Sequence, residues 1–150
     1  LPAGTASASG IATASPHRHA GRSVLLVEDD ALVAEVVRGL LEGRGHAVTR
    51  VPHALDALAA VRATEFDLAM LDLDLPGVDG FELARLLRSL GHGLPLLALT
   101  ARADAAAEPL ARAAGMDGFL RKPVDGVQLD DVIAALMAAS TLRAREPLPA

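Results

Sequence analysis

The stretch DLAMLDLDLPGVDG occupies residues 67–80 and decides the fold class. Its first five residues, 67–71, are mostly apolar, and an apolar run of this length is typical of a buried strand. Asp72 and Asp74 follow the run, and the letters LPG then mark a turn. Beyond the turn, apolar residues recur at helical spacing. The stretch therefore predicts a buried strand, an acidic loop at its carboxyl end and a helix.

The same order of strand and helix recurs on both sides of this stretch. The predicted strands are residues 24–27, 47–51, 67–71, 95–99 and 117–120, and the predicted helices are residues 30–42, 54–61, 80–90, 105–114 and 127–139. Alternating strands and helices indicate a parallel sheet with helices on both faces. Pro109 would break an interior turn of a helix but is tolerated at its first position, so we expect the fourth helix to start late, near Glu108, or to be kinked.

Composition narrows the class of protein. The chain has 150 residues, a net charge of −5 and no cysteine. The acidic balance argues against a nucleic-acid-binding face, and no apolar run approaches the roughly 20 residues of a membrane-spanning helix. We expect residues 1–22 to form a flexible linker or tail, residues 23–140 one domain, and residues 141–150 a second tail. The opening has no signal-peptide pattern and lacks Met, which favours a fragment of a longer protein or a processed product.

Distinctive polar residues follow four of the five predicted strands. Glu28, Asp29 and Asp30 follow the first strand, Asp72 the third, Thr100 the fourth, and Lys122, the only lysine, comes shortly after the fifth. In open α/β sheets the binding crevice lies outside the carboxyl ends of the strands. We therefore expect carboxylates, a hydroxyl and an ammonium group to converge in one crevice.

This set of groups points to phosphoryl chemistry assisted by a divalent cation. Carboxylates close together repel each other and need a cation, and oxygen ligands of this kind suit Mg²⁺. Asp29 and Asp72 are the expected direct ligands, and Glu28 is expected to act through water. An aspartate can also attack phosphorus, which makes Asp72 a candidate nucleophile. Lys122 would take a phosphoryl oxygen on the side away from the metal, and Thr100 would donate to another.

In their order and spacing, the motifs VLLVEDD, DLAMLDLDLPGVDG, LALTA and AGMDGFLRKP resemble those of a response-regulator receiver domain. The resemblance covers about residues 22–140 and implies a flavodoxin-like (βα)5 fold with a five-stranded parallel sheet of order 2-1-3-4-5. It also implies a cis Lys122–Pro123 peptide bond. For the site it implies Asp72 as phospho-acceptor, Glu28 and Asp29 as an acidic pocket, the Asp74 backbone carbonyl as a Mg²⁺ ligand, Thr100 and Lys122 as phosphate-binding groups, and Thr100 with Phe119 as the switch pair.

The resemblance further implies how such a domain works. Receivers take a phosphoryl group from a phosphohistidine and catalyse both this transfer and its later hydrolysis themselves. The stretch ALTA…AGMDGFLRKPV is most similar to receivers of hybrid sensor histidine kinases. The expected partner is therefore a histidine kinase core or a histidine phosphotransfer domain. We expect no direct nucleic-acid or membrane contact by this domain, and a cytoplasmic location even if the parent protein is membrane-anchored.

Several other interpretations remain open from the residues. The domain could be a stand-alone response-regulator receiver, or an interaction module with a degenerate site. The Asp72-Leu-Asp74 triplet is also similar to the D-x-D of haloacid-dehalogenase-type phosphatases, although EDD precedes it by two βα units here. Asp29 or Asp30 could cap the first helix, and Phe119 could be an ordinary core residue. Asp74 adds a negative charge beside the expected phosphoryl site.

Overall fold

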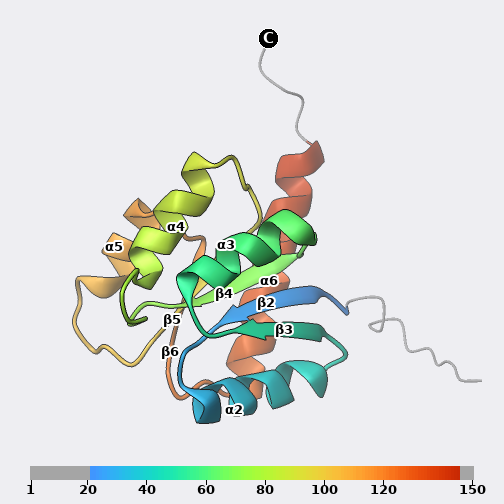
Figure 1. The fold of residues 1–150 in the computed structure, drawn as a ribbon. Coiled ribbons are helices and arrows are strands. Elements are labelled where there is room, and N and C mark those ends of the chain that lie inside the picture. Colours follow the sequence, from blue (N-terminus) through green and yellow to red (C-terminus); the bar gives the residue numbers. More distant parts are fainter. Residues whose placement is uncertain (1–20, 146–150) are drawn as a thin grey trace, which may run out of the picture.

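The computed structural model describes residues 21–145, in which five strands alternate with five helices (Figure 1). The strands are β2 (Ser23–Val27), β3 (Ala47–Val51), β4 (Leu68–Asp72), β5 (Leu96–Thr100) and β6 (Gly118–Arg121). The helices are α2 (Ala31–Glu42), α3 (Ala54–Ala63), α4 (Gly80–Ser89), α5 (Ala107–Ala113) and α6 (Gly126–Arg145). Among these residues no helix combines the length and apolar character that crossing a bilayer requires.

All five strands are parallel and lie in the order β3-β2-β4-β5-β6. Counted along the chain this is the order 2-1-3-4-5, so the predicted flavodoxin-like fold is confirmed. The chain reverses its direction across the sheet between β3 and β4, and the crevice at such a switch point is where ligands bind in open α/β folds. The topology therefore directs attention to the carboxyl ends of β2 and β4.

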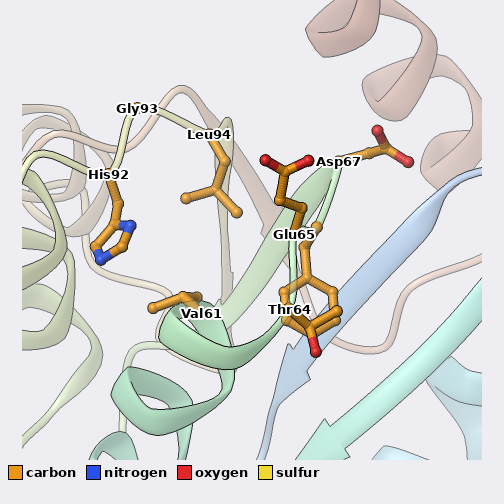
Figure 2. Close-up of a pocket in the computed structure, with 8 residues that line it drawn as sticks. Val61, Thr64, Glu65, Asp67, His92, Gly93 and Leu94 are labelled. Carbon is orange, nitrogen blue, oxygen red and sulfur yellow. The ribbon is translucent and has the colours of Figure 1, made fainter.

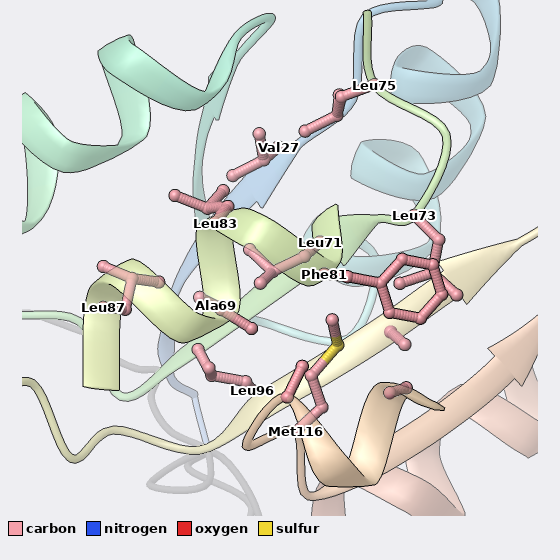
Figure 3. Close-up of a cluster of buried hydrophobic side chains, with 14 of the residues drawn as sticks. Val27, Ala69, Leu71, Leu73, Leu75, Phe81, Leu83, Leu87, Leu96 and Met116 are labelled. Atoms are coloured by element: carbon pink, nitrogen blue, oxygen red, sulfur yellow. The ribbon is translucent and has the colours of Figure 1, made fainter. Parts of the chain in front are cut away.

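Two clusters of buried side chains cover the two faces of the sheet. The first cluster lies under α3, α4 and α5, and the second lies under α2 and α6. The strands alternate between them, because Leu25 faces the first cluster and Leu26 the second. Figure 3 shows the first cluster, with Leu83 of α4 packed near Leu71 of β4. Burial on both faces explains why the central strands are continuously apolar.

The predicted element boundaries hold most closely in the strands, each of which lies within one residue of its expected range. Helix α5 starts at Ala107, which places Pro109 in its first turn, where backbone N–H groups have no intrahelical acceptor. Helix α6 continues to Arg145, six residues beyond its expected end at Ala139. The linker predicted for residues 1–22 lies outside the described residues except for its last two, and the end of the predicted C-terminal tail, residues 146–150, also lies outside them.

Candidate functional site

The predicted polar residues meet at the carboxyl edge of the sheet. Glu28 directly follows β2, Asp72 and Thr100 are the last residues of β4 and β5, and Lys122 directly follows β6. Glu28 and Thr100 are fully buried and Asp72 is 3% exposed, and they are the buried polar residues of the part of the chain that the structure describes. Burial of polar groups is unfavourable unless they are paired, so their partners define the site.

Lys122 forms ion pairs with two buried carboxylates at once. Its Nζ lies 2.6 Å from Glu28 Oε1 and 3.3 Å from Asp72 Oδ2. The Lys122 backbone N–H donates to the Thr100 carbonyl at 2.8 Å, which extends the β5–β6 ladder and aims the side chain across the edge of the sheet. The Lys122–Pro123 peptide bond is cis, as the resemblance implied. The sole lysine of the chain thus stands opposite the predicted phospho-acceptor.

The electrostatics of the site depend on burial. Burial, the largest cause, and the neighbouring Asp72 carboxyl together raise the pKa of Glu28 to about 7, and Lys122 opposes this rise only in part. Burial alone would lower the pKa of Lys122, but the carboxylates of Glu28 and Asp72 outweigh it and raise that pKa. Burial, together with the Asp72 carboxyl, therefore makes ionised Glu28 unfavourable, whereas Lys122 stays protonated.

The acidic residues can also hold a divalent cation. One carboxylate oxygen from each of Glu28, Asp29 and Asp72 lies within 4.8 Å of the others. Glu28 Oε1 is buried and, apart from the ion pair with Lys122, has no hydrogen-bond partner among residues 21–145. Asp29 is exposed, which leaves the cluster accessible from solvent. Three carboxylate donors with one open side fit a hard cation such as Mg²⁺.

Asp30 and Arg50 hold the backbone around Glu28 and Asp29, and only Asp30 was singled out in the sequence. The Asp30 carboxylate accepts hydrogen bonds from Leu32 N and Val33 N, so Asp30 caps α2. Arg50 of β3 donates from Nε to the Glu28 carbonyl at 2.9 Å and from Nη2 to the Asp29 carbonyl at 3.2 Å. The capping role that was open between Asp29 and Asp30 thus falls to Asp30, which leaves Asp29 for the metal cluster.

The loop after β4 fixes the carboxylate of Asp72. The Asp74 backbone N–H donates to Asp72 Oδ1 at 2.9 Å. Gly80 packs so closely beneath this loop that a Cβ there would lie 2.8 Å from Leu73 Cα and would also contact the Asp72 carbonyl oxygen. Asp79 caps α4 by accepting from Glu82 N. The sequence DG at 79–80 therefore starts the helix and allows the backbone to approach the acceptor.

Thr100 and Phe119, the predicted switch pair, lie on neighbouring strands. The Thr100 hydroxyl oxygen accepts from Arg102 N at 2.9 Å, and the hydroxyl donates to Asp74 Oδ2 at 3.4 Å. Phe119 is half-buried and packs against the first cluster. The Arg121 guanidinium carbon lies 5.6 Å from the centre of the Phe119 ring. Phe119 thus contacts both the core and an exposed cation.

A separate cleft of about 330 Å³ lies at the opposite end of β4 (Figure 2). Its lining residues are Val61, Thr64, Glu65, Phe66, Asp67, His92, Gly93 and Leu94. The Asp67 carboxylate points away from His92 and Val61 in Figure 2 and accepts a hydrogen bond from Ser23 N at 2.8 Å. None of the predicted site residues lines this cleft, so the candidate site is the polar crevice at the carboxyl edge.

Comparison with known proteins agrees with this geometry. Residues 24–134 match the response regulator receiver domain family. Transcriptional regulatory protein CseB of Streptomyces avermitilis is 41% identical over 114 residues, which cover 76% of this chain and 48% of CseB. Sensor histidine kinase AruS of Pseudomonas aeruginosa is 43% identical over 122 residues, which cover 79% of this chain and 12% of AruS. The chain therefore spans about half the length of CseB and a small part of AruS.

A solved structure resembles the fold over nearly all of its own length. The receiver domain of a sensor histidine kinase from Pseudomonas aeruginosa PAO1 has a TM-score of 0.72 and 29% sequence identity, and the match covers 79% of this chain and 98% of that one. That domain has a magnesium ion coordinated in its active-site cleft.

Proposed function

The chain belongs to the response regulator receiver family, and from this premise we propose that Asp72 accepts a phosphoryl group from a phosphohistidine. The observation that carries the proposal is the position of Lys122 Nζ, 3.3 Å from Asp72 Oδ2 within a crevice of buried polar groups. An ammonium group that pairs with a carboxylate can instead pair with a phosphoryl oxygen once that carboxylate is phosphorylated.

In the proposed transfer, an Asp72 carboxylate oxygen attacks the phosphorus of the phosphohistidine. A P–O bond forms while the P–N bond breaks, and the bonding electrons remain on the imidazole nitrogen of the donor. The hydrogen bond from Asp74 N to Asp72 Oδ1 orients the carboxylate for this attack. Lys122 then holds one phosphoryl oxygen, and the Thr100 hydroxyl leaves Asp74 to donate to another.

Glu28, Asp29 and Asp72 would hold Mg²⁺, and the Asp74 backbone carbonyl is proposed as a further ligand because of the resemblance. When bound, the ion neutralises part of the negative charge on the phosphoryl oxygens. The raised pKa of Glu28 supports this assignment, because burial and the nearby Asp72 carboxyl disfavour ionised Glu28 and Lys122 alone does not offset them. The cation is expected to lower that pKa again, since it favours the ionised form.

Phosphorylation is proposed to act on partners through Thr100 and Phe119. When the Thr100 side chain turns towards the phosphoryl group, the Phe119 ring is expected to move into the space that Thr100 leaves. The surface formed by α5, β6 and α6 then changes its affinity for a histidine kinase core or a histidine phosphotransfer domain. Phe119 is half-buried against the first cluster, so its ring still has exposed surface that an inward movement would bury.

We propose that the chain is part of a hybrid histidine kinase, and the identity with sensor histidine kinase AruS supports this context. The identity with CseB, a transcriptional regulator, favours the second candidate, a regulator with its own output domain. Reading the coding sequence on both sides of the chain separates the two. A preceding kinase core supports the first context, and a following DNA-binding domain supports the second.

Incubation with Mg²⁺ and acetyl phosphate tests the proposed chemistry. The proposal predicts one acid-labile, hydroxylamine-sensitive phosphoryl group per chain and little release of phosphate from phosphomonoesters. Sustained turnover of a phosphomonoester would instead support the phosphatase interpretation of Asp72 and Asp74. No incorporation and no Mg²⁺ binding would support a degenerate interaction module.

A further inference from the structure

Arg121 joins two parts of the molecule that the proposed switch has to move together. Its Nη1 donates a hydrogen bond to the Arg102 carbonyl at 2.8 Å, in the loop that follows β5. Its guanidinium carbon also lies 5.6 Å from the centre of the Phe119 ring, within the range of a cation–π contact. One side chain therefore contacts both the loop next to Thr100 and the ring proposed to respond to it.

The strand register places Arg121 where these contacts are possible. Thr100 of β5 is paired with Arg121 of β6, and Ala98 is paired with Phe119. Phe119 and Arg121 are two residues apart, so their side chains leave the same face of the sheet. Leu120 faces the second cluster on the opposite side. Lys122 follows Arg121 and forms ion pairs with Glu28 and Asp72. The two adjacent cations at this strand end therefore contact different groups.

Arg102 connects this arrangement to the switch hydroxyl. Its backbone N–H donates to Thr100 Oγ1 at 2.9 Å, while its carbonyl accepts from Arg121. The Arg102 side chain is itself held, because Nε lies 3.0 Å from Asp104 Oδ2 and the guanidinium carbon lies 5.6 Å from the centre of the Phe81 ring. The backbone of Arg102 is therefore hydrogen-bonded to the Thr100 hydroxyl through its N–H and to Arg121 through its carbonyl, so a movement of the hydroxyl can reach Arg121.

We propose that Arg121 is a positioning residue that couples Thr100 to Phe119 through the backbone of Arg102. This inference rests on the proposed function, which supplies the movement of Thr100. In the resting domain the guanidinium holds the Phe119 ring in its half-buried position. When Thr100 turns to the phosphoryl group, the shift of Arg102 draws Arg121 away and releases the ring. Arginine suits this role because its planar group can donate at its edge and contact a ring with its face.

Phe119 can be observed directly because the chain contains only three aromatic residues of the Phe, Tyr and Trp types, all phenylalanine. Aromatic ¹H–¹³C spectra of the whole chain would be recorded metal-free and with Mg²⁺ and beryllofluoride, a phosphoryl mimic. The variants are Arg121→Gln, Arg121→Lys as the conservative change, and Arg62→Gln as the control. Arg62 is an exposed arginine on α3, so its variant has the same charge change away from β6.

In the metal-free spectra, Arg121→Gln is expected to move the Phe119 ring signals towards their beryllofluoride positions. Loss of a cation–π contact at an exposed site corresponds to a roughly two- to five-fold rise in the population of the second ring position. Arg121→Lys should show a smaller displacement because it keeps the charge, and Arg62→Gln should match the wild type. Circular dichroism of each variant establishes that it is folded.

Phe119 signals that stay unchanged in Arg121→Gln, or that move equally in Arg62→Gln, would overturn the inference. The beryllofluoride spectra test the coupling itself, because in Arg121→Gln the Thr100 methyl signal should still shift while the further change at Phe119 is reduced. An unreduced Phe119 response would count against the coupling. If the wild type does not respond to beryllofluoride at all, the proposed function fails, and the metal-free spectra still report whether Arg121 holds the ring.

Discussion

Replacing Glu28 by glutamine tests the electrostatics of the site through protein stability. Burial raises the pKa of Glu28 from its ordinary value of 4.5 to about 7 in the folded domain. A carboxyl group with a raised folded pKa binds its proton more tightly in the folded state than in the unfolded state. Its contribution to stability is therefore fully present below pH 4.5 and is lost as the pH rises towards 7. Glutamine has no such proton and removes this dependence.

The size of the effect follows from the pKa change. Each pKa unit corresponds to about 1.36 kcal/mol, so a change from 4.5 to about 7 amounts to roughly 3 kcal/mol between pH 4 and pH 8. Glu28 is fully buried, so solvent screening reduces this figure little. His46 acts in the opposite direction, because burial lowers its pKa in the folded domain. Its contribution to the free energy of unfolding therefore increases as the pH rises. Since His46 is present in both proteins, it cancels in the comparison.

Urea unfolding followed by far-UV circular dichroism measures the effect, since the chain has no Trp or Tyr for fluorescence. Free energies of unfolding would be compared for wild type and Glu28→Gln at pH 4 and pH 8 without metal. Between pH 4 and pH 8, the difference in free energy of unfolding should shift by about 3 kcal/mol in favour of the Glu28→Gln variant. A difference independent of pH, or one that shifts in favour of the wild type between pH 4 and pH 8, would show that Glu28 does not bind its proton more tightly in the folded state. Added Mg²⁺ should stabilise the wild type more than the variant.

Three further substitutions, two of them with a comparison variant, test other parts of the site and the fold. Lys122→Met should destabilise the metal-free domain by about 3–5 kcal/mol, because it leaves buried carboxylates without their cation, and Mg²⁺ should restore part of this loss in thermal melts. In urea unfolding, Gly80→Ala should destabilise the domain by about 1–3 kcal/mol, because the added Cβ would collide with backbone atoms. Gly39→Ala should instead stabilise it by roughly 0.5–1 kcal/mol, because Gly39 lies in a helix and has open space around its Cα. Arg88→Ala should cost about 1–3 kcal/mol because backbone carbonyls lose a shared donor, and Arg62→Ala should change stability by less than about 0.5 kcal/mol.

The strands could be predicted because buried strands give short apolar runs in the sequence. The last residue of β4 and of β5 could not be predicted in this way. Asp72 and Thr100 are the last residues of β4 and β5, although the sequence pattern placed both just beyond the strands. Both residues still pair with the neighbouring strand, which the apolar pattern cannot reveal. Helix α6 continues past Ala139 because residues 140–145 contain neither glycine nor proline. The periodic apolar face ends earlier than the helix does.

The members of the site could be predicted from their positions at strand ends, but their pairing could not. Lys122 lies nearer to Glu28 than to Asp72, a result of the side-chain arrangement in the crevice rather than of the motif. Arg50 and Arg121 gave no signal in the sequence, because each bonds backbone from a neighbouring element. Such contacts depend on strand order and register. The sequence predicts these only through resemblance to known proteins.

Locating the phosphoryl group is the most direct test of the central claim. The domain would be incubated with Mg²⁺ and acetyl phosphate and analysed by mass spectrometry, beside Asp72→Asn and the control Asp131→Asn, an exposed position on α6. The proposed function predicts a single phosphoryl group on Asp72 of the wild type and of the control, and none in Asp72→Asn. A phosphoryl group that persists in Asp72→Asn, or that lies on another residue of the wild type, would contradict it.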